Sequence, residues 1–341
     1  MVSLCTPRPI RGPEGWDALE YCGAPLLRAR DPLGLARRLL PGAEPVYRGP
    51  WSLVARSGGL AVKVYTVAMP DNLEQEKLRA VAGHREGLSP EPVRLGAARV
   101  LGVRVPLWTV TRWVEGERLD KAVIAGMRRG AAPRDALRWL GRAVRAVHEA
   151  LAGLPPGPSR AGAAAWGWLE RLRVRAGIAR AACPGCRGAA DALESLYRVY
   201  WRMAGELSSC TAQHVHGDLH LGQALLAGES VVLLDYEGEP YRFPPAWRDE
   251  PEPVERDLAS ILRSLDYAAR IAGLREAPRG LWEAFLEGYG GRRGCPEWAL
   301  GFWLAERASY ELVYEIRART GLEWVPASFL VRLARGTGQP P

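Results

Sequence analysis

The chain has 341 residues, of which 48% are hydrophobic and 13 are tryptophan, so wholesale disorder is excluded and about two packed domains are expected. Its net charge of +8 comes from arginines interspersed with acidic residues rather than from a basic block, so we expect no nucleic-acid partner. No apolar stretch approaches the ~18 residues of a membrane helix, and the first residues do not resemble a signal peptide, so we expect a cytoplasmic protein with no membrane partner.

Residues 45–116 are expected to form a β-rich lobe. The segment 45–68 consists of short apolar runs separated by Gly-Pro and Ser-Gly-Gly turns, which is typical of strands. A Pro-Asp-Asn cluster followed by acidic residues predicts one helix over 70–84. The alternating segment 92–114 then returns to strands. The lobe is therefore predicted to be an antiparallel sheet that carries one helix.

From residue 117 to residue 341 the pattern is mainly helical. Apolar residues recur at spacings of three and four over 133–154, which predicts an amphipathic helix. Further helices are predicted over 164–182, 188–207, 254–273, 278–289 and 297–319. Between them, the segment 210–240 predicts two short strands around a Gly-Glu-Ser turn. The fold class is therefore α+β, with a β-rich N-terminal lobe and a helical C-terminal lobe.

Two of the six cysteines, Cys183 and Cys186, form a single CxxC pair. A four-ligand zinc site would require a second pair, so we interpret this segment as a turn that ends a helix and holds two unpaired cysteines. A disulfide is the alternative if the source is a hyperthermophile. Asn72 is the only asparagine, which fits a thermophile, and a GC-rich genome would produce the same scarcity.

Lys63 is one of only three lysines, and it lies inside the apolar run LAVKVY. An unpaired charge buried in a strand would cost several kcal/mol, so this lysine requires a partner. The candidates are a carboxylate of the following helix, Glu74 or Glu76, and the phosphates of a nucleotide. Protein kinases use such a strand lysine with a helix glutamate. The alternative is a lysine that faces solvent on an edge strand.

The segment QHVHGDLHLGQ contains three of the five histidines, His214, His216 and His220, together with Asp218. Clusters of this kind bind zinc in hydrolases. The corresponding HxHxDH pattern places a histidine directly after the aspartate, whereas Leu219 stands there in this chain. A zinc-dependent hydrolase is therefore a remote alternative.

The same segment also fits the catalytic loop of a kinase. Asp218 stands where the base is expected, and Gln223 follows at the spacing of a metal-binding amide. The apolar run VVLLD then delivers Asp235, the expected second metal ligand. The order Lys63, Asp218, Gln223, Asp235 predicts phosphoryl transfer that depends on ATP and Mg²⁺.

The stretches HVHGDLHLGQALL and VVLLDYEGEP resemble the aminoglycoside phosphotransferase and choline kinase superfamily. Two further stretches, 255–270 and 308–326, resemble its maltokinase branch. The resemblance implies a bilobal protein kinase-like fold. It also implies an ATP- and Mg²⁺-dependent sugar kinase that transfers the γ-phosphoryl group to the anomeric hydroxyl of maltose, so that a small sugar and ATP are the expected partners.

The resemblance also implies a role for each motif residue. Asp218 would orient the sugar hydroxyl and accept its proton, while Gln223 and Asp235 would hold Mg²⁺. Lys63, held by Glu74, would steady the phosphates of ATP.

Adenine is expected in the interlobe cleft beside the segment 108–116, which makes Thr111 and Trp113 candidate ATP-binding residues.

Carboxylates and aromatic side chains suit a pocket for a hydroxyl-rich sugar. The candidate acceptor-binding residues are His220, Glu237, Glu239, Tyr310, Glu311, Tyr314 and Glu315. In the last helix, surface pairs of Arg307 with Glu311 and of Glu315 with Arg319 are the alternative interpretation. We expect His214 and His216 to brace the loop through backbone hydrogen bonds. Asp257 is equally interpreted as a loop brace or as a simple helix acid.

Two features depart from the maltokinase pattern. Residues 1–44 form only a short N-terminal segment where maltokinases carry a longer cap, so a reduced cap is expected. The segment EPVYRGPWSLVAR is not a glycine-rich phosphate loop. A kinase of glucosamine, of another monosaccharide or of an aminoglycoside is therefore the alternative, and a non-catalytic pseudo-kinase is a remote one.

Overall fold

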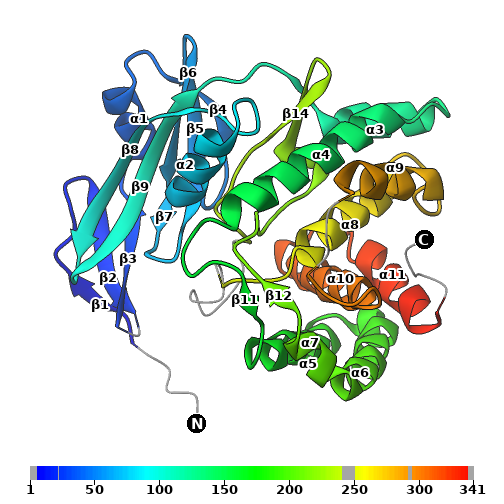
Figure 1. Cartoon of the computed structure of the whole chain (residues 1–341). Coiled ribbons are helices and arrows are strands. Elements are labelled where there is room, and N and C mark those ends of the chain that lie inside the picture. The colour runs from blue at the N-terminus through cyan, green and yellow to red at the C-terminus, as the bar shows by residue number, and fades with distance from the viewer. Residues whose placement is uncertain (1–5, 22, 240–249, 291–293, 337–341) are drawn as a thin grey trace. The chain divides into compact units, whose positions relative to one another are not determined.

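A computed structural model describes residues 6–21, 23–239, 250–290 and 294–336. The chain divides into two compact units (Figure 1). The first consists of Met1–Glu115 and Val232–Glu250, and the second of Gly116–Val231 and Pro251–Pro341. This division differs from the expected segments 1–44, 45–116 and 117–341, because the N-terminal residues belong to the first unit and the chain returns to that unit at Val232. Among the described residues, no helix is long and apolar enough to cross a membrane.

The main sheet of the first unit is antiparallel, with the strand order β4-β5-β6-β9-β8 (Figure 1). Its strands are β4 (Glu44–Arg48), β5 (Ser52–Ser57), β6 (Leu60–Tyr65), β8 (Pro92–Val100) and β9 (Val103–Arg112). One helix, α2 (Glu74–His84), contacts β8. The expected sheet with one helix is thus present. Lys63 lies on β6 between Val54 and Thr109 of the neighbouring strands, so it occupies a central strand and not an edge.

A second sheet of the first unit is built mainly from N-terminal residues for which no strand was predicted. It has the order β1-β2-β3-β7, with β1 (Arg8–Ile10), β2 (Trp16–Tyr21), β3 (Ala24–Ala29) and β7 (Val67–Ala68). A short helix, α1 (Pro32–Leu39), follows and begins at Asp31, whose side chain accepts a hydrogen bond from the backbone N–H of Gly34 at 2.9 Å. The Leu- and Ala-rich strands pair with each other and with β7, which is distant in sequence, so local pattern did not reveal them.

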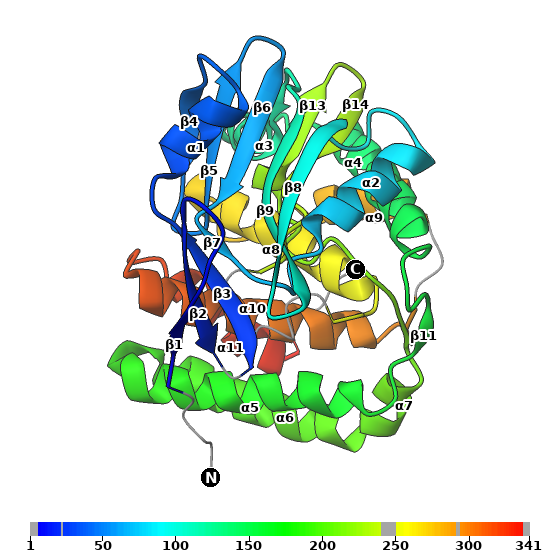
Figure 2. The same ribbon diagram turned by 90° about the vertical axis from the view of Figure 1, so that its left-hand side faces the viewer.

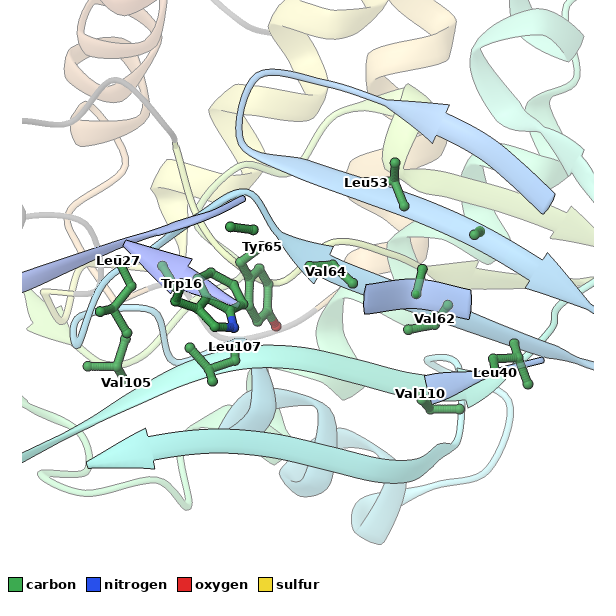
Figure 3. Close-up of a cluster of buried hydrophobic side chains, with 14 of the residues drawn as sticks. Trp16, Leu27, Leu40, Leu53, Val62, Val64, Tyr65, Val105, Leu107 and Val110 are labelled. Carbon is green, nitrogen blue, oxygen red and sulfur yellow. The ribbon is translucent and has the colours of Figure 1, made fainter. Parts of the chain in front are cut away.

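The two sheets share one apolar core. Trp16 of β2 and Leu27 of β3 lie in the same buried cluster as Val64 and Tyr65 of β6 and Leu107 of β9 (Figure 3). Burial of this apolar surface is the main favourable term that holds the strand of Lys63 in place. The N-terminal residues therefore contribute core to the sheet and are not a separate cap.

The second unit is mainly helical, as predicted. Its helices are α3 (Leu119–Arg128), α4 (Arg134–Leu151), α5 (Ala164–Ala182), α6 (Arg187–Arg202), α7 (Ala204–Ser208), α8 (Glu255–Ile271), α9 (Arg279–Tyr289), α10 (Ala299–Ala318) and α11 (Trp324–Ala334). Short 3-10 turns occur at η1 (Pro184–Cys186) and η2 (Leu221–Gln223). Helices α5 and α6 pack side by side (Figure 2). The expected helix over 188–207 is interrupted at Met203, whose N–H bonds to Tyr200 O, and α3 and α11 were not predicted.

Five short strands complete the described elements. The hairpin of β13 (Ala224–Ala227) and β14 (Ser230–Leu233) forms around the predicted Gly-Glu-Ser turn, and β10 (Glu117–Arg118) pairs with β13. Strand β11 (Ser159–Arg160) pairs with β12 (Thr211–Ala212), directly before the histidine-rich loop. The hairpin carries the chain to Asp235, as the sequence pattern indicated.

Four cysteines of the second unit form two disulfides, Cys183–Cys186 and Cys210–Cys295. The interpretation of Cys183 and Cys186 as unpaired residues is therefore corrected: η1 brings their Cα atoms to 5.2 Å, within reach of a bond. Cys5 and Cys22 lie outside the described residues.

The two disulfides are expected to differ in their effect on stability. Cys210–Cys295 spans 85 residues and Cys183–Cys186 spans 3, and a bond that closes a longer loop removes more entropy from the unfolded chain. Replacing both Cys210 and Cys295 with alanine should lower the free energy of unfolding by about 2–4 kcal/mol. Replacing both Cys183 and Cys186 with alanine should lower it by about half as much. Urea unfolding of both double variants measures this difference. Equal losses would contradict the loop-entropy argument.

Candidate active site

Lys63 is surrounded by carboxylates of the first unit. Its Nζ lies 2.9 Å from Glu74 Oε2, 3.1 Å from Glu74 Oε1 and 3.2 Å from Glu237 Oε1, and it also donates to Asp235 Oδ1. Glu76 instead pairs with Arg104 at 2.6 Å, which decides between the two candidate helix acids. The expected pairing of Lys63 with Glu74 is therefore present, and the alternative of a solvent-facing lysine is excluded, since its side chain is 11% exposed.

Three carboxylates, those of Glu74, Asp235 and Glu237, lie around this one ammonium group. Burial by itself would lower the pKa of Lys63, but the charges of Asp235, Glu237 and Glu74 raise it well above its ordinary value. Lys63 therefore stays protonated at neutral pH. The side chain of Asp235 is 33% exposed, and its backbone is in the left-handed region, with φ of 63°.

The position of Glu74 is fixed from two sides. The side chain of Asn72 accepts a hydrogen bond from the backbone N–H of Glu74 at 2.9 Å, so the only asparagine in the chain supports the start of α2. The buried Gln75 donates to Gly96 O at 2.8 Å and to Trp108 O at 2.9 Å, which ties α2 to β8 and β9. These bonds hold the helix in the register that directs Glu74 to Lys63.

The two candidate adenine-binding residues lie at the end of β9. Thr111 pairs with Ala61 of β6, and the backbone N–H of Trp113 donates to Gly59 O at 2.8 Å. The guanidinium carbon of Arg56 lies 4.5 Å from the centroid of the Trp113 ring. One face of this indole is therefore occupied by a cation, which limits Trp113 to stacking with its other face or its edge.

In the second unit, Asp257 holds the loop that precedes Asp218. Its carboxylate accepts from the backbone N–H groups of His216 at 2.8 Å and Gly217 at 3.1 Å, and His148 Nε2 lies 3.0 Å away. Burial would raise the pKa of Asp257, but the hydrogen bond and charge of His148 lower it well below its usual range. Asp257 is fully buried, so it is a loop brace and not a simple helix acid.

The loop histidines bond to the backbone. His214 Nε2 lies 2.8 Å from Pro155 O, and the backbone N–H of Asp218 donates to His216 Nδ1 at 3.4 Å, as expected for bracing residues. His220, a candidate sugar ligand, accepts at Nδ1 from the N–H of Gly222 at 3.1 Å and caps η2, the turn that holds the half-buried Gln223. Within the described ranges, no group of three or more His, Cys, Asp or Glu residues is placed to bind a metal.

Asp218 is contacted by Arg307, a residue that the sequence analysis considered only as one half of an alternative surface pair with Glu311. Arg307 Nη1 donates to Asp218 Oδ1 at 3.0 Å, and Arg307 Nε donates to Glu311 Oε1 at 3.4 Å. Both Arg307 and Glu311 are buried, so they are not an ordinary surface pair. The sequence feature that could have indicated a buried, paired Arg307 is the apolar segment FWLAERASYELV around it, where a charge without a partner would be costly.

The other acceptor candidates of α10 have distinct surroundings. Glu311 also accepts two hydrogen bonds from the buried Arg263, at 3.0 and 2.9 Å, and burial raises its pKa against the opposing charges of Arg263 and Arg307. Glu315 is buried and accepts from Tyr267 at 3.0 Å. Tyr310 is buried, and Tyr314 is 37% exposed.

Two further acceptor candidates, Glu237 and Glu239, are buried in the first unit, where Glu237 pairs with Lys63.

The chain is similar to known phosphotransferases and sugar kinases. The model of the "Phosphotransferase enzyme family" matches residues 57–238. A glucosamine kinase of Mycolicibacterium smegmatis is 27% identical over 217 residues, which are 55% of this chain and 53% of the relative. A glucosamine kinase of Streptacidiphilus jiangxiensis is 31% identical over 166 residues, 44% of this chain and 36% of the relative. The chain thus spans about half or less of the length of these curated relatives.

Solved structures confirm the expected α+β, kinase-like fold. A glucosamine kinase in complex with glucosamine, ADP and inorganic phosphate has a TM-score of 0.77 at 20% identity, over 98% of this chain and 96% of that chain. A spectinomycin phosphotransferase in complex with ADP and spectinomycin has a TM-score of 0.56 at 13% identity, over 86% of this chain and 92% of that chain.

Proposed function

We propose that this chain, which belongs to the phosphotransferase enzyme family, transfers the terminal phosphoryl group of ATP to a hydroxyl of an amino sugar. The relatives reported above are glucosamine kinases, and the similar fold with the highest reported TM-score binds glucosamine and ADP. Maltose was the acceptor expected first. The comparisons favour the alternative acceptor class, so glucosamine replaces maltose in the proposal.

One observation about Asp218 carries the proposal. Among the described residues, only Arg307 bonds to its carboxylate, and it does so at Oδ1. Because the side chain of Asp218 is 19% exposed, Oδ2 can accept a proton from a substrate hydroxyl. The hydrogen bond from Arg307 orients this carboxylate. The loop backbone is held by Asp257, so the base is preorganised.

The first unit supports the nucleotide half of the proposal. Lys63, with Glu74 behind it, would bind the phosphates of ATP, as the strand lysine of kinases does. Asp235 and Gln223 supply a carboxylate and an amide oxygen, and these are the ligand types that Mg²⁺ takes. When bound, such an ion neutralises charge on the phosphates. The side chain of Asp235 is 33% exposed, so its carboxylate is accessible to such an ion.

The acceptor is tested by incubating the protein with MgATP and, in turn, glucosamine, glucose, maltose and kanamycin. We expect the highest kcat/KM with glucosamine, because its ammonium group can pair with a carboxylate of the acceptor pocket, which glucose and maltose cannot engage by charge. A coupled assay measures the release of ADP. Phosphorus NMR should show one signal from the sugar phosphate product. A higher kcat/KM with maltose would restore the first expectation. Absence of turnover with every sugar would refute a sugar kinase.

A further inference from the structure

Tyr310, on α10, lies against two guanidinium groups. The guanidinium carbon of Arg307 is 5.1 Å from the centroid of its ring, and that of Arg175, on α5, is 5.5 Å away. The Tyr310 side chain is only 6% exposed, so both contacts are largely removed from water. Cations are attracted to the face of an aromatic ring, and this attraction strengthens when water is excluded. We call Arg175, Tyr310 and Arg307 the Tyr310 clamp.

The two like charges of the clamp are compensated separately. Arg175 Nη1 donates to Glu306 Oε1 at 2.8 Å, to Glu306 O at 2.9 Å and to Ser309 Oγ at 3.0 Å. Arg307 instead pairs with Asp218 and Glu311. Each arginine therefore has its own acidic partners, and the Tyr310 ring lies beside both guanidinium groups. This arrangement allows two buried cations to lie near one tyrosine without net repulsion.

The Arg175 side of the clamp is also connected to the start of the loop of Asp218. Arg171, one turn before Arg175 on α5, donates to Glu252 Oε1 at 2.5 Å and lies 3.4 Å from Glu306. The backbone of Glu252 pairs with Gln213 through N–H to O bonds of 3.1 and 2.8 Å. A shift of α5 relative to α10 would thus displace both Arg307 and the beginning of the loop.

We propose that Tyr310 and Arg175 are positioning residues that hold the guanidinium of Arg307 against Asp218. This inference rests on the proposed function, because it takes Asp218 as the base of phosphoryl transfer. It assigns Tyr310 a supporting role in place of the direct sugar contact expected from the sequence. The ring restricts Arg307 on one side, while Glu311 restricts it on another, so that Asp218 Oδ1 keeps its partner and Oδ2 stays directed to the acceptor.

Kinetics of matched variants test this role. Tyr310→Leu removes the ring face, and we expect kcat to fall about tenfold because small misplacements at a reacting group are costly. Tyr310→Phe keeps the face and should restore kcat, while KM for ATP stays unchanged in both variants. Arg175→Lys, which keeps the charge but not the planar guanidinium, should give an intermediate fall. Tyr200, a buried tyrosine of α6, provides the control: Tyr200→Leu should lower the melting temperature without changing kcat.

A second measurement does not depend on activity. In ¹⁵N NMR spectra, the Nε–H signal of Arg307, identified by its loss in Arg307→Lys, should exchange slowly with water in the wild type and in Tyr310→Phe. It should exchange faster in Tyr310→Leu. Equal exchange in the Leu and Phe variants, or equal kcat values for the two, would overturn the clamp. If the wild type phosphorylates no acceptor, the proposed function fails, and the NMR comparison still decides the clamp.

Discussion

Replacement of Asp218 by asparagine is expected to lower kcat by about 100- to 10,000-fold, the usual contribution of a general base. Asparagine has the same shape, and its amide oxygen can still accept the hydrogen bond from Arg307, so the loop should keep its structure. What is lost is the ability to take the proton of the acceptor hydroxyl. Because the groups assigned to ATP binding lie on Lys63 and its neighbours, the Kd for ADP should not change.

This variant is best measured beside a matched one. Asp191→Asn removes an exposed aspartate of α6 that pairs with Arg180, and we expect it to retain wild-type kcat. Coupled detection of ADP release gives kcat, and calorimetric titration with ADP gives the Kd. Wild-type turnover by Asp218→Asn would show that Asp218 is not the base. A large rise of the Kd for ADP would show that the substitution disturbs the nucleotide site as well.

The parts of the site that follow from sequence are those with local patterns. Lys63 was identifiable because it is a rare lysine in an apolar strand, and Asp218 and Gln223 because their spacing is fixed by one loop. Asp235 follows a hairpin that the turn residues predicted. The antiparallel sheet and most helices likewise depend on periodicity within single segments. These features require no knowledge of which segments meet.

The features that sequence did not reveal depend on contacts between distant segments. The strands β1–β3 lack β-branched runs and are completed by β7, some forty residues after β3. Arg307 and Glu311 show the usual spacing of a surface pair, whereas both are buried where α10 contacts Asp218 and Arg263. The same holds for Glu237, a predicted sugar ligand that lies beside Lys63.

The remaining large effect concerns Lys63. Lys63→Met should leave the carboxylates of Glu74, Asp235 and Glu237 without their shared cation, two of them at buried positions. Removing one partner of a buried ion pair costs about 3–5 kcal/mol, so the first unit should lose stability of that order at neutral pH. KM for ATP should rise as well, because the phosphates lose their lysine. Amide hydrogen exchange in β6 reports the stability of this region.

The pH dependence has a defined sign. In the wild type the pKa of Lys63 is raised on folding, so its stabilisation is fully present below the unfolded pKa, about 10.4, and is lost as pH rises through the higher folded value. In Lys63→Met, the buried carboxylates of Glu74 and Glu237 lose the charge of Lys63, so their protonation should restore stability to the variant as pH falls from 7 to 5. Lys121→Met, at an exposed position of α3, is the control. It should change neither the stability at neutral pH nor the dependence of stability on pH. A loss of stability in Lys63→Met that is independent of pH between 5 and 7 would mean that Lys63 acts by packing and not by its charge.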